Sequence, residues 1–152
     1  MLLLDADRRN QSMDGFFDFQ NDSSWIDALK SAGHPGEAFH RIGQSKLFVS
    51  LSCNCAVSTP EIFNDRFECM CEKLKAGFDM VLIDSVPLTI SPDGLAIASK
   101  VDGVILVVEA EKTRWQTARQ VRESISRVGG NILGVVLNKK RYYIPKAIYK
   151  HL

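Results

Sequence analysis

The 152-residue sequence lacks several features that would assign it to a particular class of protein. No apolar run approaches the roughly 20 residues that a membrane-spanning helix needs; the densest, Val104 to Val108, has the length of a strand. Neither sign of charge dominates, because 19 Lys and Arg residues stand against 18 Asp and Glu residues. This balance argues against a protein built to bind nucleic acid or a membrane surface. The first residues, MLLLDAD, lack the basic segment of a signal peptide.

Internal repeats, linkers and low-complexity segments are also missing. The composition, with 45% hydrophobic and 24% charged residues, is that of an ordinary globular protein. A chain of this length can bury a sizeable core without disulfides or metals. We therefore expect a cytoplasmic chain that folds as a single domain over residues 1–152.

The four cysteines occur as two C-x-C pairs, Cys53/Cys55 and Cys69/Cys71, without the usual C-x-x-C spacing of zinc sites. Cys69 and Cys71 fall in a predicted helix, where residues two apart point to different sides. We expect free thiols, as is usual in a reducing cytoplasm. Binding of zinc or an iron–sulfur cluster is the weaker alternative.

Apolar runs of strand length alternate with segments of helical periodicity along the chain. Strands are expected at residues 2–4, 47–51, 80–83, 104–108 and 132–137. Helices are expected at residues 24–29, 58–77, 91–98 and 113–128, the last capped by Thr113. Strands that are apolar on both faces and alternate with helices predict an α/β fold: a mostly parallel sheet with helices on both faces.

Acidic side chains follow two of the predicted strands. Asp5 and Asp7 come at the end of the first strand, and Asp84 ends the strand at residues 80–83. The carboxyl ends of parallel strands meet at one edge of a sheet, where ligands bind, and carboxylate oxygens suit Mg²⁺. The alternative for any one of them is an Asp that simply forms a turn.

Four segments carry a resemblance to a known family. They are LLLDADRR (residues 2–9), VLIDSVP (81–87), VDGVILVVEAEKTR (101–114) and GVVLNKK (134–140). In this order they resemble the second Walker motif, the Walker B motif and the later portion of bacterial tyrosine kinases, the BY-kinases. These kinases are relatives of the MinD/ParA-type P-loop ATPases. The resemblance covers nearly the whole chain and implies a P-loop NTPase-like fold.

The resemblance also implies roles for single residues. Asp5 and Asp84 would hold the Mg²⁺ of Mg-ATP, mainly through water, and Asp7 would help to deprotonate a substrate tyrosine. Arg9 would fix the motif or neutralise phosphate. Asn138 would contact the adenine base, although an Asn at this position is equally typical of a strand end.

All three tyrosines, Tyr142, Tyr143 and Tyr149, lie in the last 11 residues. By resemblance they are autophosphorylation sites that a neighbouring subunit of a homo-oligomer modifies. The alternative is a short docked helix with Ile144, Ile148 and Leu152 on one face. The family further implies a membrane-bound polysaccharide chain-length protein as partner, and thus a place at the inner face of the membrane without insertion.

The motif G-x-x-x-x-G-K-[ST], which cradles phosphates in this class, is absent from the 152 residues. In the family it precedes the D-x-D strand, and its own strand lies between the strands matched by residues 81–84 and 104–108. We therefore expect a truncated domain that binds ATP poorly and is inactive as an isolated chain. Either the two flanking strands close up on each other, or another chain covers the gap between them.

Three other functions remain open. LLLDAD also resembles the first motif of haloacid-dehalogenase-type phosphatases, with Asp5 as nucleophile and Asp7 as acid. A phosphoacceptor receiver module would use Asp5 and Asp7 as its acidic pair, Asp84 as acceptor, and Lys139 after the last strand. The third is a non-catalytic remnant that binds and regulates the polysaccharide partner.

Overall fold

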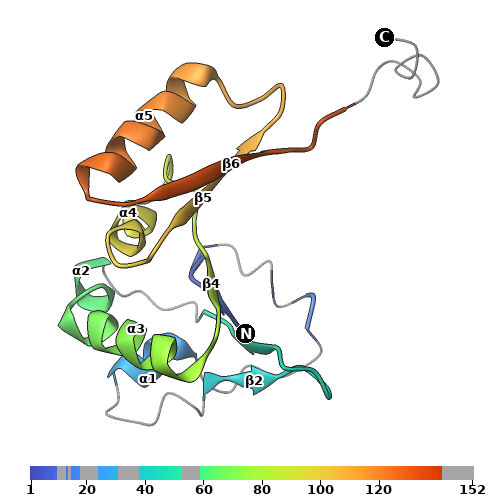
Figure 1. Cartoon of the computed structure of the whole chain (residues 1–152), viewed down its shortest axis with the longest axis vertical. Helices are drawn as coiled ribbons and strands as arrows, with labels where there is room; N and C mark the ends of the chain where they lie inside the picture. Colours follow the sequence, from blue (N-terminus) through green and yellow to red (C-terminus); the bar gives the residue numbers. More distant parts are fainter. Residues whose placement is uncertain (10–12, 14, 18–23, 31–37, 53–58, 142–152) are drawn as a thin grey trace.

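The structure is a computed structural model that describes residues 1–9, 13, 15–17, 24–30, 38–52 and 59–141. Its strands form two separate sheets (Figure 1). The four-stranded sheet has the order β2 (His40–Arg41), β3 (Phe48–Ser50), β1 (Leu2–Asp5), β4 (Val81–Asp84). The two-stranded sheet consists of β5 (Val104–Glu109) and β6 (Ile132–Asn138). All pairings are parallel except that of β2 with β3, so the predicted α/β fold with a mostly parallel sheet is confirmed.

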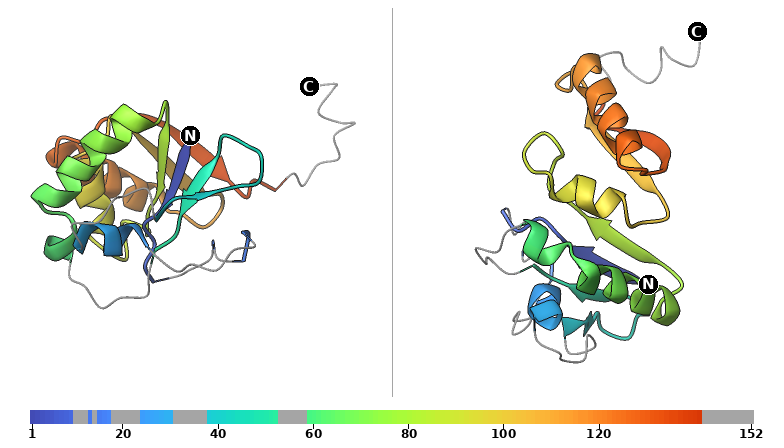
Figure 2. Two further views of the ribbon diagram at one scale, coloured as in Figure 1. Left: turned by 90° about the horizontal axis from the view of Figure 1, so that it is seen from below. Right: turned by 90° about the vertical axis from the view of Figure 1, so that its left-hand side faces the viewer.

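Five helices connect these strands in the described part of the chain: α1 (Trp25–Lys30), α2 (Thr59–Ile62), α3 (Asp65–Gly77), α4 (Asp93–Ala98) and α5 (Trp115–Arg127). Helices α3, α4 and α5 lie along the same side of the strands (Figures 1 and 2). None of the described helices combines the length and the apolar character that crossing a bilayer requires.

Two local predictions about helices are wrong. The helix expected over residues 58–77 is two helices, because Asn64 adopts an extended conformation and its side chain accepts a hydrogen bond from the Arg66 N–H at 2.9 Å. Asn64 thereby caps the amino end of α3 and separates this helix from α2. Thr113 does not cap α5; its hydroxyl accepts a hydrogen bond from the Glu109 N–H at 3.0 Å instead. The short antiparallel strand β2 was not predicted at all.

The hydrophobic core lies between the four-stranded sheet and the helices α1 and α3. Alternation along the strands sends Leu2 and Leu4 inward, where both are fully buried. Trp25 of α1 packs against Phe67 of α3 with ring centroids 6.0 Å apart. The cluster of buried apolar side chains includes Ile97 of α4 but no residue of β5 or β6. The two-stranded sheet is therefore attached to the core through α4 and not through its own strands.

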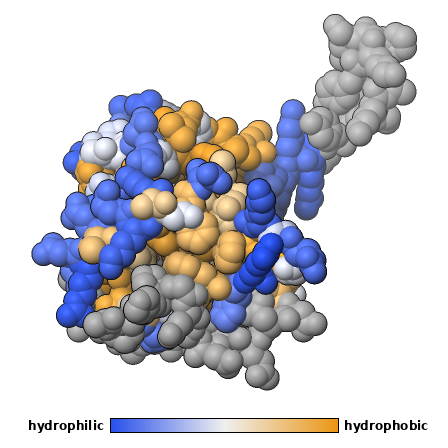
Figure 3. Space-filling model, turned by 60° about the horizontal axis from the view of Figure 1, so that its bottom comes forward, coloured by the Kyte–Doolittle hydropathy of each residue, from blue (hydrophilic) through white to orange (hydrophobic). Residues whose placement is uncertain are grey.

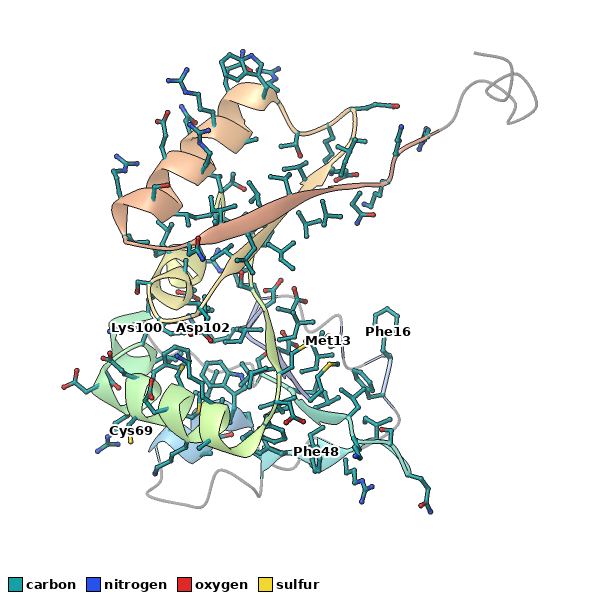
Figure 4. The ribbon with its side chains drawn as sticks, in the orientation of Figure 1. Met13, Phe16, Phe48, Cys69, Lys100 and Asp102 are labelled. Carbon is teal, nitrogen blue, oxygen red and sulfur yellow. The ribbon has the colours of Figure 1, made fainter. Side chains whose placement is uncertain are left out.

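Two ion pairs between α3 and the α4–β5 connection reinforce this attachment. Lys100 lies 2.9 Å from Glu68, and Asp102 lies 3.0 Å from Lys75; Figure 4 shows Lys100 and Asp102 beside α3. Ion pairs between exposed side chains are screened by solvent. They add little to stability, but they tie the start of β5 to α3.

The strands β4 and β5 are not hydrogen bonded to each other; each pairs on one side only, β4 with β1 and β5 with β6. Of the two arrangements expected around the gap, direct closure of these strands is therefore not found. The gap between the sheets persists in the described structure.

Candidate active site

Asp5 is held rigidly at the carboxyl end of β1. The side chain is 1% exposed, and its Oδ1 accepts a hydrogen bond from the Asp7 N–H at 2.8 Å. The backbone carbonyl of Asp5 accepts a hydrogen bond from the Trp25 indole N–H at 2.6 Å. In the sequence Trp25 falls in the helix expected at residues 24–29, with nothing that connects it with Asp5. The structure shows that this buried ring also fixes the backbone on which the carboxylate stands.

Asp7 follows on the loop after β1 and is half-buried. Its Oδ1 accepts a hydrogen bond from the Arg9 N–H at 3.1 Å, and its carbonyl accepts one from the Ser52 hydroxyl at 3.3 Å. Ser52 is fully buried just beyond β3. Arg9 itself is exposed, so its side chain faces solvent beside the motif.

Asp84 lies beside these residues, at the end of the neighbouring strand. Asp5 and Asp84 are register partners in the pairing of β1 with β4, and paired strands lie about 4.8 Å apart. Loss of hydration raises the pKa of Asp84 above its ordinary value, and repulsion by Asp7 raises it further, against the opposing effect of the Ser85 N–H. The register of β1 with β4 places Asp5 and Asp84 at the same edge of the sheet.

No group of three or more His, Cys, Asp or Glu side chains within the described ranges could hold a metal ion by itself. A hydrated Mg²⁺ needs fewer protein ligands, since it keeps several waters and is bound through one or two carboxylates. Asp5 and Asp84 supply hard oxygen donors at adjacent strand ends. In donor chemistry they fit a water-mediated magnesium site.

The remaining predicted site residues do not join this cluster through any described contact. Asn138 ends β6 in the other sheet, where its side chain accepts a hydrogen bond from the Lys139 N–H at 2.8 Å. The Lys139 ammonium lies 3.2 Å from Glu109 of β5. The three tyrosines, Tyr142, Tyr143 and Tyr149, lie outside the described residues.

A buried ion pair next to the site was not predicted. Arg8 Nη2 lies 2.7 Å from Asp93 Oδ2, with the two side chains 14% and 4% exposed. The Thr59 hydroxyl at the start of α2 also donates to Asp93. Burial alone would raise the pKa of Asp93, but the hydrogen bonds from Arg8 and Thr59 and the charge of Arg8 lower it. Asp93 therefore joins the loop after β1 to the first turns of α2 and α4.

The sequence contains only a weak signal for this pair. Arg8 and Arg9 are adjacent, and Asp93 reads as an ordinary first-turn residue of a helix. The pairing joins residues 85 positions apart, so it is decided by the fold.

The described cysteines agree with the prediction of free thiols. Cys69 is exposed and Cys71 is buried, on different sides of α3, and Figure 4 shows Cys69 pointing outward. Burial raises the pKa of the Cys71 thiol. Cys53 and Cys55 lie outside the described residues.

A shallow hollow of about 830 Å³ lies elsewhere, between the end of α5 and the start of β6, lined by Arg122, Arg127 and Asn131 among others. The hollow is at the amino end of β6, whereas ligands of parallel sheets bind beyond the carboxyl ends. We therefore place the candidate site at the carboxylates.

The chain is similar in sequence to known proteins. No protein-family model matches the chain. A tyrosine-protein kinase CpsD of Streptococcus agalactiae is 30% identical over 140 residues, which are 91% of this chain and 61% of that protein. Other relatives of this chain are also named as bacterial tyrosine-protein kinases. A second CpsD, from Streptococcus pneumoniae, is 27% identical over 147 residues, which are 95% of this chain and 65% of that protein. The chain therefore spans less than two thirds of the length of either kinase.

Solved structures show the same fold. The kinase domain of VpsO superposes with a TM-score of 0.84 at 24% identity, over 92% of this chain and 70% of that one. The chimerical protein CapA2B2 gives a TM-score of 0.83 at 21% identity, over 93% of this chain and 63% of that one. MinD of Aquifex aeolicus gives 0.54 at 18% identity, over 91% and 69%. The chain thus has the fold of bacterial tyrosine kinase domains and of MinD-like proteins.

A shorter match is with a protein named for succinoglycan biosynthesis and transport. The succinoglycan biosynthesis transport protein ExoP of Rhizobium meliloti is 34% identical over 68 residues, which are 45% of this chain and 9% of that protein.

Proposed function

We propose that this chain is the carboxylate-bearing part of a tyrosine kinase domain, acting in the biosynthesis of a capsular or extracellular polysaccharide. The reaction is transfer of a phosphoryl group from Mg-ATP to a tyrosine hydroxyl. The observation that carries the proposal is the convergence of three carboxylates on one sheet edge, with Asp5 and Asp84 in register and Asp7 close enough to Asp84 to raise its pKa.

Each carboxylate has a role that suits its surroundings. Asp5 and Asp84 bind hydrated Mg²⁺, which neutralises phosphate charge when the nucleotide is bound. Asp7, half-buried on the loop, accepts the proton of the attacking tyrosine hydroxyl. Arg9 is exposed beside Asp7 and can neutralise phosphate charge. Asn138 contributes to the base pocket.

The physiological setting follows from the relatives. The ExoP and CapA2B2 similarities support association with a membrane-bound polysaccharide co-polymerase, which would bring the domain to the inner membrane face from the cytoplasm. Tyr142, Tyr143 and Tyr149 are the proposed sites of phosphorylation between copies of a homo-oligomer.

Residues 1–152 contain no G-x-x-x-x-G-K-[ST] loop. Without that phosphate cradle we propose that this chain by itself binds Mg-ATP weakly and transfers no phosphate. Calorimetric titration that gave micromolar affinity would contradict this part of the proposal.

The kinase role is tested by restoring the loop. The chain is fused behind the phosphate-loop segment of the S. agalactiae kinase and assayed for tyrosine phosphorylation with Mg-ATP. We expect activity, and a loss of about 10²-fold or more in Asp7→Asn, because general-base catalysis contributes that much. Asp65→Asn, a change of the same kind at an exposed position of α3, is the control and should keep full activity.

Two results would instead support other functions. Turnover of p-nitrophenyl phosphate by residues 1–152, abolished in Asp5→Asn, would indicate a phosphatase. Tight binding of beryllofluoride at Asp84 would indicate a receiver module.

A further inference from the structure

Charge is distributed unevenly along the chain. Residues 112–127, which include all of α5, hold five basic residues and a single acid. The 152 residues together carry a net charge of only +1, so the rest of the chain is net negative. The overall balance therefore conceals one strongly basic element.

The basic side chains of α5 lie on its solvent-facing side. The helix packs inward through Ile125, which is fully buried, and through Val121, which is half-buried. Trp115, Arg119 and Arg122 follow one another at i, i+4 and i+7, so they line one outer face of the helix. All three are exposed, and Figure 4 shows side chains that end in nitrogen along the outer side of α5.

Much of this positive charge is not neutralised by the protein. Arg119 pairs at 2.8 Å with Glu123, the single acid of the segment. Within the described ranges Arg114, Arg122 and Arg127 form no ion pair. Arg122 and Arg127 also line the shallow hollow between the end of α5 and the start of β6. These three arginines can therefore pair with an anionic partner.

Trp115 adds a large aromatic ring to the same face. Its side chain is 65% exposed, and the Arg119 guanidinium lies 6.0 Å from the centre of the ring. Tryptophan is enriched where membranes meet water, because its ring suits the headgroup region. Basic residues are attracted to anionic lipids at the same level. The face thus combines the two side-chain types that suit the surface of an anionic bilayer.

The shape of this face suits an extended partner better than a small anion. The 13 residues of α5 extend over about 20 Å. The arginines are spread from Arg114 to Arg127 along this length and do not surround one point. The surface of a bilayer presents negative charge over an area of this size, and its potential attracts each basic residue that comes near.

We propose that the outer face of α5 docks on the anionic surface of a lipid bilayer. The face consists of Arg114, Trp115, Arg119, Arg122 and Arg127. Its arginines lie against lipid phosphates, and Trp115 reaches into the headgroup region. The proposal goes beyond the proposed kinase function and does not depend on phosphoryl transfer.

The test is co-sedimentation of the intact 152-residue chain with lipid vesicles. One set of vesicles is an equimolar mixture of phosphatidylcholine and phosphatidylglycerol, and the other is phosphatidylcholine alone. We expect binding to the anionic vesicles only. Raising the salt concentration from about 0.1 M to about 1 M should abolish this binding, because the Debye length falls from about 10 Å to about 3 Å.

Tryptophan fluorescence shows whether α5 is the part in contact with lipid. Trp25 and Trp115 are the two tryptophans of the chain, and Trp25 is fully buried in the core. A shift of the emission to shorter wavelength on addition of anionic vesicles therefore reports on Trp115. Trp115→Phe should abolish the shift while the vesicles still bind.

Two charge-matched double variants locate the binding face. Arg122→Gln with Arg127→Gln should weaken binding about 25-fold, since each basic residue near an anionic surface contributes about fivefold. Lys46→Gln with Lys73→Gln removes the same charge outside α5 and should leave binding unchanged. All four side chains are exposed, so both variants should fold, which circular dichroism checks.

Binding through an apolar surface is distinguished by its dependence on salt and lipid. Figure 3 shows hydrophobic side chains gathered on one face of the molecule, with hydrophilic ones around them. Contact through such a surface would persist at high salt and would extend to phosphatidylcholine alone. Either result would overturn the proposal.

Three further results would also overturn it. One is absence of binding to anionic vesicles at about 0.1 M salt. Another is equal weakening by the two double variants, or an unchanged tryptophan emission when vesicles are bound. The third is binding of polyglutamate by a chain that does not bind vesicles, which would indicate an acidic protein segment as the partner.

Discussion

At the scale of single residues, the candidate site depends on side chains that are not acids of the motif. Trp25 fixes the carbonyl of Asp5, and the buried pair of Arg8 with Asp93 fixes the loop that carries Asp7. Arg8, and not Arg9, is the arginine embedded in the structure, since Arg9 is exposed. Of the two adjacent arginines, Arg8 thus stabilises the fold, whereas Arg9 faces solvent.

Asp93→Asn should destabilise the chain strongly at neutral pH. It leaves the Arg8 guanidinium buried without its counter-charge, which costs about 3–5 kcal/mol for a buried pair. The free energy of unfolding, measured with urea at pH 7, should fall by roughly that amount. Asp102→Asn is the control, because its pair with Lys75 is exposed and screened by solvent, so its loss should change stability little.

The same variant has a defined pH dependence. The folded state lowers the pKa of Asp93, so its contribution is fully present above the unfolded value of about 3.9. The contribution is lost as the pH falls through the lower folded-state pKa. The difference between Asp93→Asn and the unmodified chain should therefore shrink below about pH 4. A difference that stayed constant down to pH 2 would contradict the assignment of the ionised pair.

At the scale of elements, the break between α2 and α3 decides how the aromatic core is built. Asn64, the N-cap of α3, directly follows Phe63. The rings of Phe63 and Phe67 meet edge to face with their centroids 4.9 Å apart. Both rings also lie within about 6.4 Å of Trp25. The cap therefore sets the direction of the helix that covers the sheet beside Asp5.

Asn64→Ala should lower the free energy of unfolding by about 1 kcal/mol, since the Arg66 N–H loses its acceptor. Asn64→Ser should retain most of the stability, because serine is an equally good cap. Thermal unfolding of the three proteins measures both effects. Equal stability of the alanine and serine variants would show that the cap does not matter here.

At the scale of the whole molecule, the side chains of the four-stranded sheet are more deeply buried than those of the two-stranded sheet. The shared core draws on the four-stranded sheet, α1, α3 and α4, whereas the strand residues Leu133, Val135, Val136 and Leu137 of β6 are 48–67% exposed. A sheet with little buried apolar area has little to hold it in place.

We expect native-state hydrogen exchange to reveal this inequality. Backbone amides of β5 and β6 should exchange through local opening, at least about tenfold faster than those of β1, because exchange follows local stability. Mass spectrometry of peptic fragments measures both regions in one experiment. Equal protection of the two sheets would mean that they unfold as one unit.

Much of the fold could be predicted from the sequence because its determinants are local. Uninterrupted apolar runs at Leu2–Leu4 and Val104–Val108 predicted parallel strands, and the acids that follow residues 2–4 and 80–83 predicted a polar sheet edge. The position of the helix break at Asn64 could not be read from periodicity, since apolar residues continue at helical spacing across it. A single side-chain hydrogen bond decides it.

The sequence by itself determined most of the segments that become strands and helices, and where carboxylates stand along them, because both follow from patterns a few residues long. Tertiary structure alone decided that Arg8 meets Asp93 and that Trp25 supports Asp5, since these contacts join residues 85 and 20 positions apart. It alone decided that β4 and β5 remain apart. Two ion pairs tie α3 to the connection between α4 and β5, while β4 and β5 belong to different sheets in the described part of the chain.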